Sequence, residues 1–504
     1  MGSMADSKRL VTTDDIDKLK QLLSGTNAEV RGPSDSGYDK SIERWSKAAE
    51  KPAGVAVAPT CAQDVSIAIK YAAENGLDLA VKGGGHSTAG VSSTNGGILI
   101  DLQSKMRKVD VDPEKRLLYI QGGALWSDVD EAAWNHGLAT VGGTVADTGV
   151  GGLTLGGGYG VLSGAYGLVI DNTVSFETVL ANGEIKRSSK EENSDLFWAL
   201  NGAGQNFGVT TEFVLQAYPQ EKIYMGTMLF PAETEVISKL VAALNELYKV
   251  QETPQGPQTK SLGRAMSLVG FAKPPPLGGK TAVLMNAVYD GPEEEGKKIF
   301  QPFFDIGPIV NQMRLDAYPN ANKLVPAMYG MRSSMKGAAH MMPIREQFVH
   351  DIKGAYDGFI DTCEDAAPSV VAWELYDPVK VATLDQGSFA NRGYHFNSLV
   401  MPMWSKPEND VRCRQFARDI STMFKKEIEN HGAKASGGIE GGASVRGSKG
   451  AVLLYGNYDQ YDEISKDVYG DNYPRLQKIK GQYDPNNMFN KLFAIQPEKA
   501  SSQL

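Results

Sequence analysis

The most constraining feature of this sequence is a short apolar run at residues 79–81 that leads, after one lysine, into three glycines, a histidine and a serine. These five residues are Gly83, Gly84, Gly85, His86 and Ser87. Consecutive glycines carry no Cβ atoms, so their backbone N–H groups can approach a ligand closely and turn toward it. A strand that ends in such a loop can hold a pyrophosphate, with the imidazole beside it. An ordinary loop with a structural histidine is the alternative, and this segment alone leaves both open.

The size and charge of the chain narrow its class. Its 504 residues predict two domains. The net charge of −9 comes with scattered Lys and Arg, so we expect no nucleic-acid partner. No window approaches 18 uninterrupted apolar residues, and the residues after Met4 lack the apolar core of a signal peptide. We therefore expect a cytoplasmic protein without a membrane partner, whose oligomeric state the sequence leaves open.

Cysteine and histidine usage argues against a metal site. The three cysteines (Cys61, Cys363 and Cys413) are far apart, and no His-x-x-x-His or Cys-x-x-Cys pair occurs. A serine hydrolase would need a Gly-x-Ser-x-Gly turn, which is also absent from the sequence. We therefore expect neither a bound metal nor a nucleophilic serine.

Secondary-structure signals divide the chain into parts. A strand, a helix and a second strand at residues 55–81 precede the glycine loop, which is an α/β order. Past residue 219, longer amphipathic helices such as 408–430 alternate with strands, and glycine-rich punctuation returns near residue 450. The predicted segments are 1–220, 221–449 and 450–504, the middle one being a separate domain with a sheet and covering helices.

Glycine clusters recur at residues 143–160 and 202–208. Neither contains the Gly-x-Gly-x-x-Gly pattern of a dinucleotide fold in the required place, and a P-loop-like Gly279-Lys280-Thr281 has Pro274 where the first glycine is needed. Several glycine-rich backbones suit a long anionic cofactor that is held from several loops. Tight turns in a twisted sheet are the alternative explanation.

Several segments of the chain, among them residues 96–102 and the pair Pro59 and Asp64, match one family. The other segments are residues 81–87, 149–160, 195–200, 206–209, 455–458 and 483–489. In these segments the chain resembles the flavin-linked oxidases of the vanillyl-alcohol-oxidase fold, and within them the fungal branch of the berberine-bridge-enzyme-like group. The resemblance extends over almost the whole chain, although the middle region carries few of these landmarks.

The resemblance implies an α+β fold with two domains. Both chain ends would form a PCMH-type FAD-binding domain, and the middle segment would be a substrate domain with an antiparallel sheet covered by helices. The residues that we expect to contact FAD are Gly83, Gly84, Gly85, His86, Ser87, Gly90, Gly143, Thr144, Thr148, Gly149, Gly151, Gly152, Gly208, Val209 and Asn457.

The resemblance also implies a covalent flavin. A ring nitrogen of His86 would bond to the flavin 8α-methyl group. Many relatives add a second bond through a cysteine, but the matching position here is Val145, and none of the three cysteines is near it in sequence. We therefore expect attachment through His86 only.

The reaction that the resemblance implies is hydride transfer from a substrate carbon to FAD, which O2 reoxidises with release of H2O2. The expected substrate is an alcohol, amine or phenolic small molecule, as in secondary metabolism. Tyr458 matches the family's catalytic base, and its pKa of about 10 would have to be lowered by neighbours. Tyr458 packing over the flavin is the alternative role. A carbohydrate oxidase, or an isomerase or cyclase with a structural flavin, are the alternative functions.

Substrate contacts are expected on or beside strands of the middle domain. The candidates are Trp373, Tyr376, Arg392, His395 and Trp404. Arg392 and His395 are suited to orienting a carboxylate or phenolate. Each of the five is equally compatible with a place in the core or on the surface.

Overall fold

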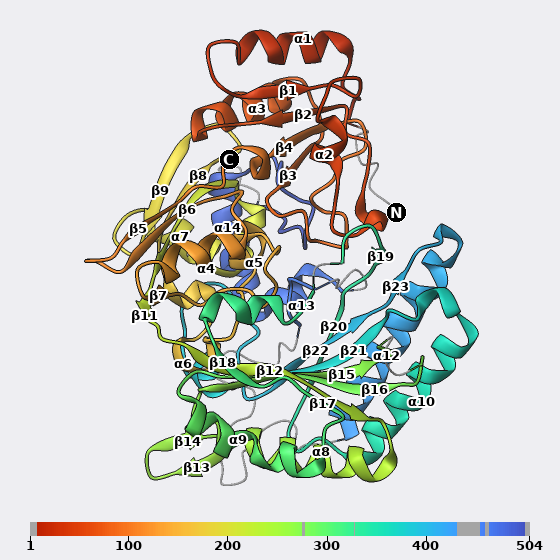
Figure 1. Cartoon of the computed structure of the whole chain (residues 1–504). Coiled ribbons are helices and arrows are strands. Elements are labelled where there is room, and N and C mark those ends of the chain that lie inside the picture. The colour runs from red at the N-terminus through yellow and green to blue at the C-terminus, as the bar shows by residue number, and fades with distance from the viewer. Residues whose placement is uncertain (1–7, 275–277, 327, 431–453, 459–462, 499–504) are drawn as a thin grey trace.

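The computed structural model describes residues 8–274, 278–326, 328–430, 454–458 and 463–498. Its elements form two α+β bodies, one above the other in Figure 1. Within the described residues, no helix has the length and apolar character needed to cross a membrane.

The N-terminal body begins with a four-stranded sheet in the order β1-β2-β4-β3, in which the last three strands are parallel and β1 is antiparallel to β2. Its elements are α1 (Thr13–Leu22), β1 (Glu29–Arg31), α2 (Tyr38–Ile42), β2 (Val55–Ala58), α3 (Ala62–Glu74), β3 (Leu79–Lys82) and β4 (Ile98–Asp101). Helix α3 ends where Gly76 adopts a φ of +62°, and the Leu77 N–H then donates to the Ala72 carbonyl at 3.0 Å. This turn directs β3 toward the glycine loop.

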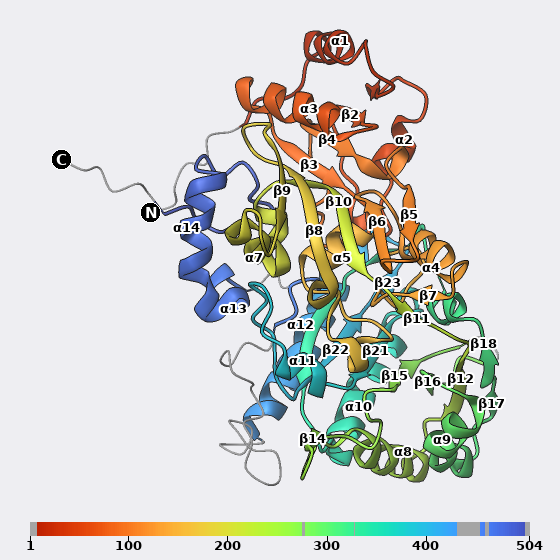
Figure 2. The ribbon, with the colours of Figure 1, turned by 90° about the vertical axis from the view of Figure 1, so that its left-hand side faces the viewer.

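A five-stranded antiparallel sheet, β5-β6-β10-β8-β9, completes the N-terminal body. Its strands are β5 (Val109–Asp112), β6 (Leu117–Gln121), β8 (Thr173–Val179), β9 (Ile185–Ser189) and β10 (Val209–Gln216), with β7 (Leu138–Ala139) paired to β11 (Tyr218–Pro219) beside them. The helices are α4 (Trp126–Trp134), α5 (Val150–Leu155), α6 (Ser163–Tyr166), α7 (Ser194–Ala203), α13 (Ser465–Tyr469) and α14 (Tyr473–Tyr483). Figure 2 shows α14, from the C-terminal end of the chain, beside α7.

A buried ion pair fixes the C-terminal segment in this body. Lys480 Nζ lies 2.6 Å from Asp484 Oδ2, and both side chains are fully buried. The same amine donates to the backbone oxygens of Asn206 and Phe489 at 2.6 and 2.7 Å. Burial lowers the pKa of Lys480, while Asp484 opposes that shift. The described residues from 463 onward therefore pack with the first segment, whereas the predicted boundary at 449/450 lies outside the described residues.

The second body is built on a large antiparallel sheet in the order β17-β12-β16-β15-β21-β22-β20, with β18 also paired to β12. Its strands are β12 (Ile223–Pro231), β15 (Ala265–Ala272), β16 (Ala282–Tyr289), β17 (Val310–Asn311), β18 (Arg314–Asp316), β20 (Lys336–His340), β21 (Val370–Tyr376) and β22 (Phe396–Met401). Small pairs are β13 (Gln251–Thr253) with β14 (Gly256–Gln258) and β19 (Arg332–Ser333) with β23 (Met403–Trp404).

Among the described residues, the long helices of this body cover one face of the sheet. They are α8 (Thr234–Tyr248), α9 (Glu293–Ile306), α10 (Glu346–Thr362) and α12 (Asp410–Asn430), while α11 (Val379–Thr383) lies toward the other body. Side chains of the opposite sheet face, such as Met225 and Tyr376, join the core of the N-terminal body. This arrangement is the helix-covered antiparallel sheet that was predicted for the middle segment.

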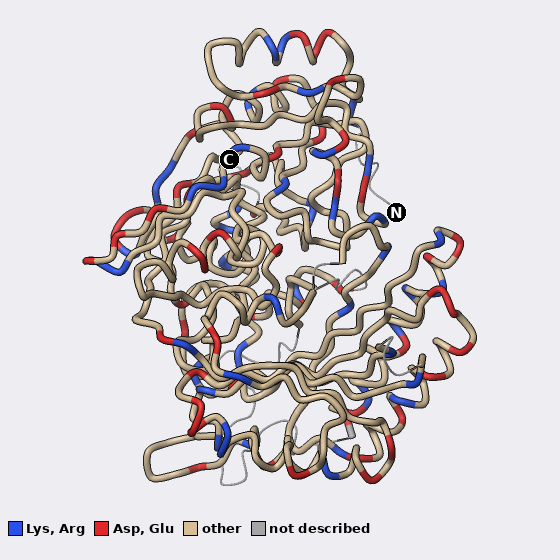
Figure 3. Tube along the Cα trace, in the orientation of Figure 1, with Lys and Arg blue, Asp and Glu red and all other residues tan. Residues whose placement is uncertain are grey.

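A buried ion pair joins the two bodies. Lys, Arg, Asp and Glu are otherwise interspersed along the outer segments (Figure 3). Arg392 Nη2 of the second body lies 2.7 Å from Asp171 Oδ1 of the first, and the two side chains are 1% and 2% exposed. Arg392 also donates to the Val381 carbonyl at 3.1 Å. The structure thus places Arg392 at the domain contact rather than at a substrate, because its guanidinium is already held by Asp171.

We predict that Arg392→Met destabilises the protein by about 3–5 kcal/mol, because it leaves the buried Asp171 carboxylate without a counter-charge. Thermal and urea unfolding would measure this loss. The double variant Arg392→Met/Asp171→Leu should recover most of it, since no charge then remains buried. A raised KM with unchanged stability would instead indicate a substrate-binding arginine.

Candidate active site

A cavity of about 340 Å³ lies where the glycine loop, the second glycine cluster, the C-terminal segment and the large sheet meet. We call it the central cavity. It is lined by thirteen of the fifteen residues expected to contact FAD, namely Gly83, Gly84, Gly85, His86, Ser87, Thr144, Thr148, Gly149, Gly151, Gly152, Gly208, Val209 and Asn457. The other two lie outside this lining: Gly143 packs on the Trp126 ring, and Gly90 lies beside Ala49.

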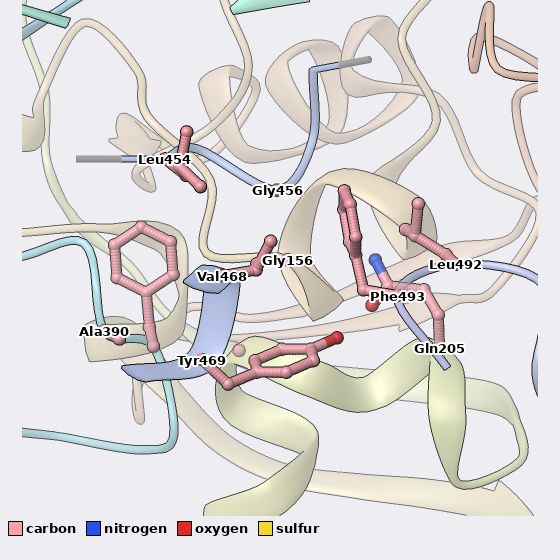
Figure 4. A pocket seen from close by; sticks show the side chains of 11 residues that line it. Gly156, Gln205, Ala390, Leu454, Gly456, Val468, Tyr469, Leu492 and Phe493 are labelled. Carbon is pink, nitrogen blue, oxygen red and sulfur yellow. The ribbon is translucent and has the colours of Figure 1, made fainter. Parts of the chain in front are cut away.

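A much smaller pocket of about 10 Å³, shown in Figure 4, borders the central cavity. The two share Gln205, Gly456 and Leu492. Its volume is about that of a single water molecule. The central cavity is therefore the candidate site for a cofactor and a substrate.

The two glycine loops touch each other through their backbones. A Cβ on Gly84 would lie 2.4 Å from the backbone nitrogen of Gly149, and a Cβ on Gly149 would lie 2.2 Å from that of Gly84. Any side chain at either position would therefore separate the loops. Gly85 also needs to be glycine for a conformational reason, because its φ is +69°.

Other glycines face the cavity instead of protein atoms. A Cβ on Gly152 would meet no heavy atom within 4 Å, and one on Gly83 would meet only the Gly122 carbonyl, at 3.3 Å. Both glycines line the central cavity, so their bare backbones leave room for another molecule. A cradle of backbone N–H groups without side chains fits the pyrophosphate of FAD.

His86 lies at one wall of the central cavity. Its ring stacks on Trp45, with centroids 4.7 Å apart, and its Nε2 atom lies 3.7 Å from Asp147 Oδ1. Val145 also lines the cavity, whereas Cys61 is exposed and Cys363 and Cys413 are buried in the helix-covered core of the second body. Among the described lining residues there is thus one histidine, and no cysteine, that could form a covalent bond to a flavin.

Tyr458 and Glu374 form the main polar pair of the cavity. The Tyr458 hydroxyl donates to Glu374 Oε1 at 2.6 Å, which links the C-terminal segment to β21. The second carboxylate oxygen, Oε2, is buried and has no hydrogen-bond partner among the described residues. Burial raises the pKa of Glu374 to about 7, although the hydrogen bond from Tyr458 opposes that shift.

The pKa of Tyr458 moves in the opposite direction from the one expected. Burial raises it well above its ordinary value, and the neighbouring Glu374 raises it further. The phenol therefore stays protonated near neutral pH and acts as a donor. Glu374 was missed from the sequence, although it is the one acidic residue in an otherwise apolar strand, two positions before Tyr376.

The alternation of β21 explains which candidate residues reach the cavity. Glu374 and Tyr376 point into it, because side chains two positions apart share a sheet face. Trp373 points to the opposite face, where its ring lies 5.9 Å from Phe271 and 5.7 Å from Phe424. Trp373 is therefore a core residue, and Tyr376 is the predicted substrate contact that the cavity contains.

His395 and Trp404 are also outside the central cavity. His395 borders a separate narrow pocket behind Glu374 and Tyr376, where its Nε2 contacts Asn391 Oδ1. The buried Trp404 ring donates from Nε1 to Asp410 Oδ1 at 2.7 Å. Both side chains have structural partners: His395 lies in the loop directly before β22, and Trp404 is the last residue of β23.

The part of the cavity around Tyr376, which we call the substrate side, is lined mainly by aromatic and apolar side chains. Tyr159 lies 5.5 Å from Tyr376 and 5.1 Å from Tyr455, and Tyr455 lies 5.0 Å from Tyr458, each measured between ring centroids. Leucine, valine and methionine side chains complete this side: Leu268, Val325, Met335 and Leu399.

Few charges line the cavity. Among the described lining residues, Glu374 and Lys491 are the acidic and basic side chains, and Lys491 is paired to Asp78 at 2.7 Å. No group of His, Cys, Asp and Glu among the described residues is suited to hold a metal ion. The described lining thus contains one carboxylate group whose second oxygen has no hydrogen-bond partner, and no free Lys or Arg side chain.

Comparisons with known proteins agree with this geometry. Residues 53–189 match the model of an FAD binding domain, and residues 454–495 match the berberine and berberine-like model. An FAD-linked oxidoreductase of Aspergillus terreus is 31% identical over 493 residues, which is 96% of each chain. The chain therefore belongs to the FAD-linked oxidoreductases, and it is an FAD-dependent enzyme that oxidises a small molecule.

Solved structures share the fold. The 6-hydroxy-D-nicotine oxidase of Arthrobacter nicotinovorans superposes with a TM-score of 0.72 at 24% identity, covering 94% of this chain and 98% of that one. Glucooligosaccharide oxidase from Acremonium strictum, whose FAD is 6-S-cysteinyl and 8α-N1-histidyl, gives 0.74 at 20% identity and covers 96% and 100%. These likenesses confirm the predicted α+β fold of the PCMH type.

Proposed function

We propose that this enzyme oxidises a small, largely apolar alcohol, amine or phenol, with Glu374 as the proton acceptor. The observation that carries the proposal is that Glu374 lines the cavity and that its buried Oε2 atom has no hydrogen-bond partner among the described residues. An unpaired buried acceptor is costly, so a substrate that brings an O–H or N–H donor would be favoured at this atom.

The cofactor and the chain divide the chemistry between them. Bound FAD supplies the hydride acceptor, and O2 is the proposed final oxidant, with H2O2 as product. The glycine loops orient the cofactor, and the aromatic side chains around Tyr376 exclude water. Glu374 takes the proton that the substrate hydroxyl or amine must lose as the hydride leaves.

Tyr458 has a supporting role in this proposal. Its phenol is held protonated by burial and donates to Glu374 Oε1, so it orients the carboxylate and keeps Oε2 directed at the substrate. A carboxylate with a pKa of about 7 is well matched to a general base that works near neutral pH. This assignment replaces Tyr458 as the base itself.

The side chains that line the cavity favour some substrate classes over others. A carboxylate substrate would meet Glu374 without a free Lys or Arg partner in the described lining. A sugar would need many polar contacts, whereas the described substrate side is made mainly of Leu268, Leu399 and tyrosine rings. An uncharged or cationic substrate with an apolar body is therefore favoured over a carbohydrate.

We predict H2O2 release from hydroxylated or amino-substituted aromatic compounds and little or none from oligosaccharides and aromatic acids. A peroxide assay over such a panel measures this preference. Anaerobic mixing with the best compound should bleach the flavin absorbance. Conversion without bleaching would support an isomerase or cyclase, and turnover confined to sugars would refute the proposed substrate class.

We predict that activity rises with pH through about 7, because Glu374 accepts a proton only when it is ionised. Glu374→Gln should lower kcat by about 10²–10⁴-fold and remove this inflection. Tyr458→Phe should cost only about 10-fold and move the midpoint to higher pH, because a hydrogen bond that lowers the pKa of Glu374 is lost.

Leu268→Met serves as the control, since Leu268 pairs with Glu374 across β15 and β21 and carries no proton to transfer. Its pH profile should match that of the wild type. If Tyr458→Phe were as damaging as Glu374→Gln while the inflection stayed in place, Tyr458 would be the base.

We also propose that His86 is the only covalent tether of the flavin. His86 lies in the cavity wall, while Val145 occupies the position of the second tether that the family resemblance indicates. Digestion and mass spectrometry of the wild type should therefore find one flavin, on the peptide that contains His86. His86→Ala should release all flavin on denaturation, and any flavin that stays bound would reveal a second site.

A further inference from the structure

We infer that Asp147 is the positioning residue for flavin attachment. Its carboxylate would fix the proton of His86 on Nε2, leave Nδ1 free to bond the flavin, and stabilise the positive charge that the ring then acquires. This inference rests on the proposed tether at His86. It extends that proposal, because it gives this chain's own acidic side chain a part in forming the bond.

The geometry carries the inference. Asp147 Oδ1 lies 3.7 Å from His86 Nε2, and the two side chains are only 14% and 16% exposed. Neither Nε2 nor either carboxylate oxygen forms a direct hydrogen bond to a described residue. The Trp45 ring stacks on the imidazole, and the backbone N–H of Trp45 donates to the Gly85 carbonyl at 3.1 Å. The ring is thus held with Nε2 toward an acid.

Asp147 is the anion that this pair needs. Burial raises the pKa of its carboxyl, but interaction with His86 and the Tyr329 hydroxyl outweighs burial, so the pKa lies below its ordinary value. The cations nearest the glycine loop are engaged elsewhere: Lys82 Nζ donates to the Ser41 carbonyl at 3.0 Å, and Arg44 Nη1 donates to the Glu43 carbonyl at 2.8 Å. They leave the Asp147 charge available to His86.

The tautomer follows from this contact. The proton of a neutral imidazole stays on the nitrogen that faces an acceptor, so a carboxylate at Nε2 leaves the lone pair on Nδ1. An acid that orients a reacting imidazole and stabilises its cationic form is the same arrangement that a catalytic triad uses.

The attachment step balances with O2 as the oxidant. The bond from Nδ1 to the flavin 8α carbon forms, and one C–H bond of that methyl group breaks. Two electrons pass to O2, which leaves as H2O2 with the methyl proton and the Nε2 proton. The imidazole is cationic between bond formation and loss of the Nε2 proton, and this is the stage at which the Asp147 carboxylate acts.

The test measures attachment rather than turnover. Wild type, Asp147→Asn and Asp147→Ala would be produced with limited riboflavin and then incubated with FAD in air. Covalent flavin would be followed by fluorescence of the denatured protein and by intact mass. We expect both variants to bind FAD but to attach it about 10- to 100-fold more slowly, the range found when a partner that orients a metal-ligating histidine is removed.

Formate supplies a rescue that a structural role would not give. It should restore attachment in Asp147→Ala, where a carboxylate can enter the vacated space. The exposed Asp110→Asn is the matched control and should behave as wild type. Wild-type rates in Asp147→Asn, or a slow Asp147→Ala that formate leaves unchanged, would overturn the inference. A wild type without covalent flavin would instead refute the tether at His86, and this inference with it.

Discussion

The close approach of Gly84 and Gly149 is the contact on which the rest of the site depends. The two loops come from different parts of the N-terminal body, and they meet at distances that no side chain would permit. Their contact sets the shape of the glycine-lined part of the cavity, and His86 lies at the wall of this part. Because the contact is made of backbone alone, it adds no side-chain charge to the binding surface.

Residues of both bodies form the opposite wall of the cavity. Glu374 stands on the large sheet, Tyr458 on the C-terminal segment, and their hydrogen bond closes the gap between them. The domain contact through Arg392 and Asp171 lies on the same side of the molecule as α11 and keeps the two bodies in register. The proposed base, Glu374, keeps its position relative to Tyr458 only as long as the two bodies do not shift.

The glycine-rich part of the cavity lining could be predicted from the sequence, and the side chains that the large sheet contributes could not. Glycines that hold a cofactor are needed for their backbone, so their clusters are visible in any context. The side chains of β21 depend on which face the strand turns to the cavity, and its alternation alone does not distinguish Trp373 from Glu374. Arg392 depends on Asp171, which lies 221 residues earlier, and a partner at that distance leaves no local signal.

The buried pair of Lys480 and Asp484 has a consequence for how the protein is made. It anchors the last part of the chain, which supplies Asn457 and Tyr458, in a body that begins near the N-terminus. The first 450 residues thus leave the ribosome before the cavity has all of its walls. Until the chain end docks, the unfinished body exposes apolar surface, which makes late synthesis the stage that is most prone to aggregation.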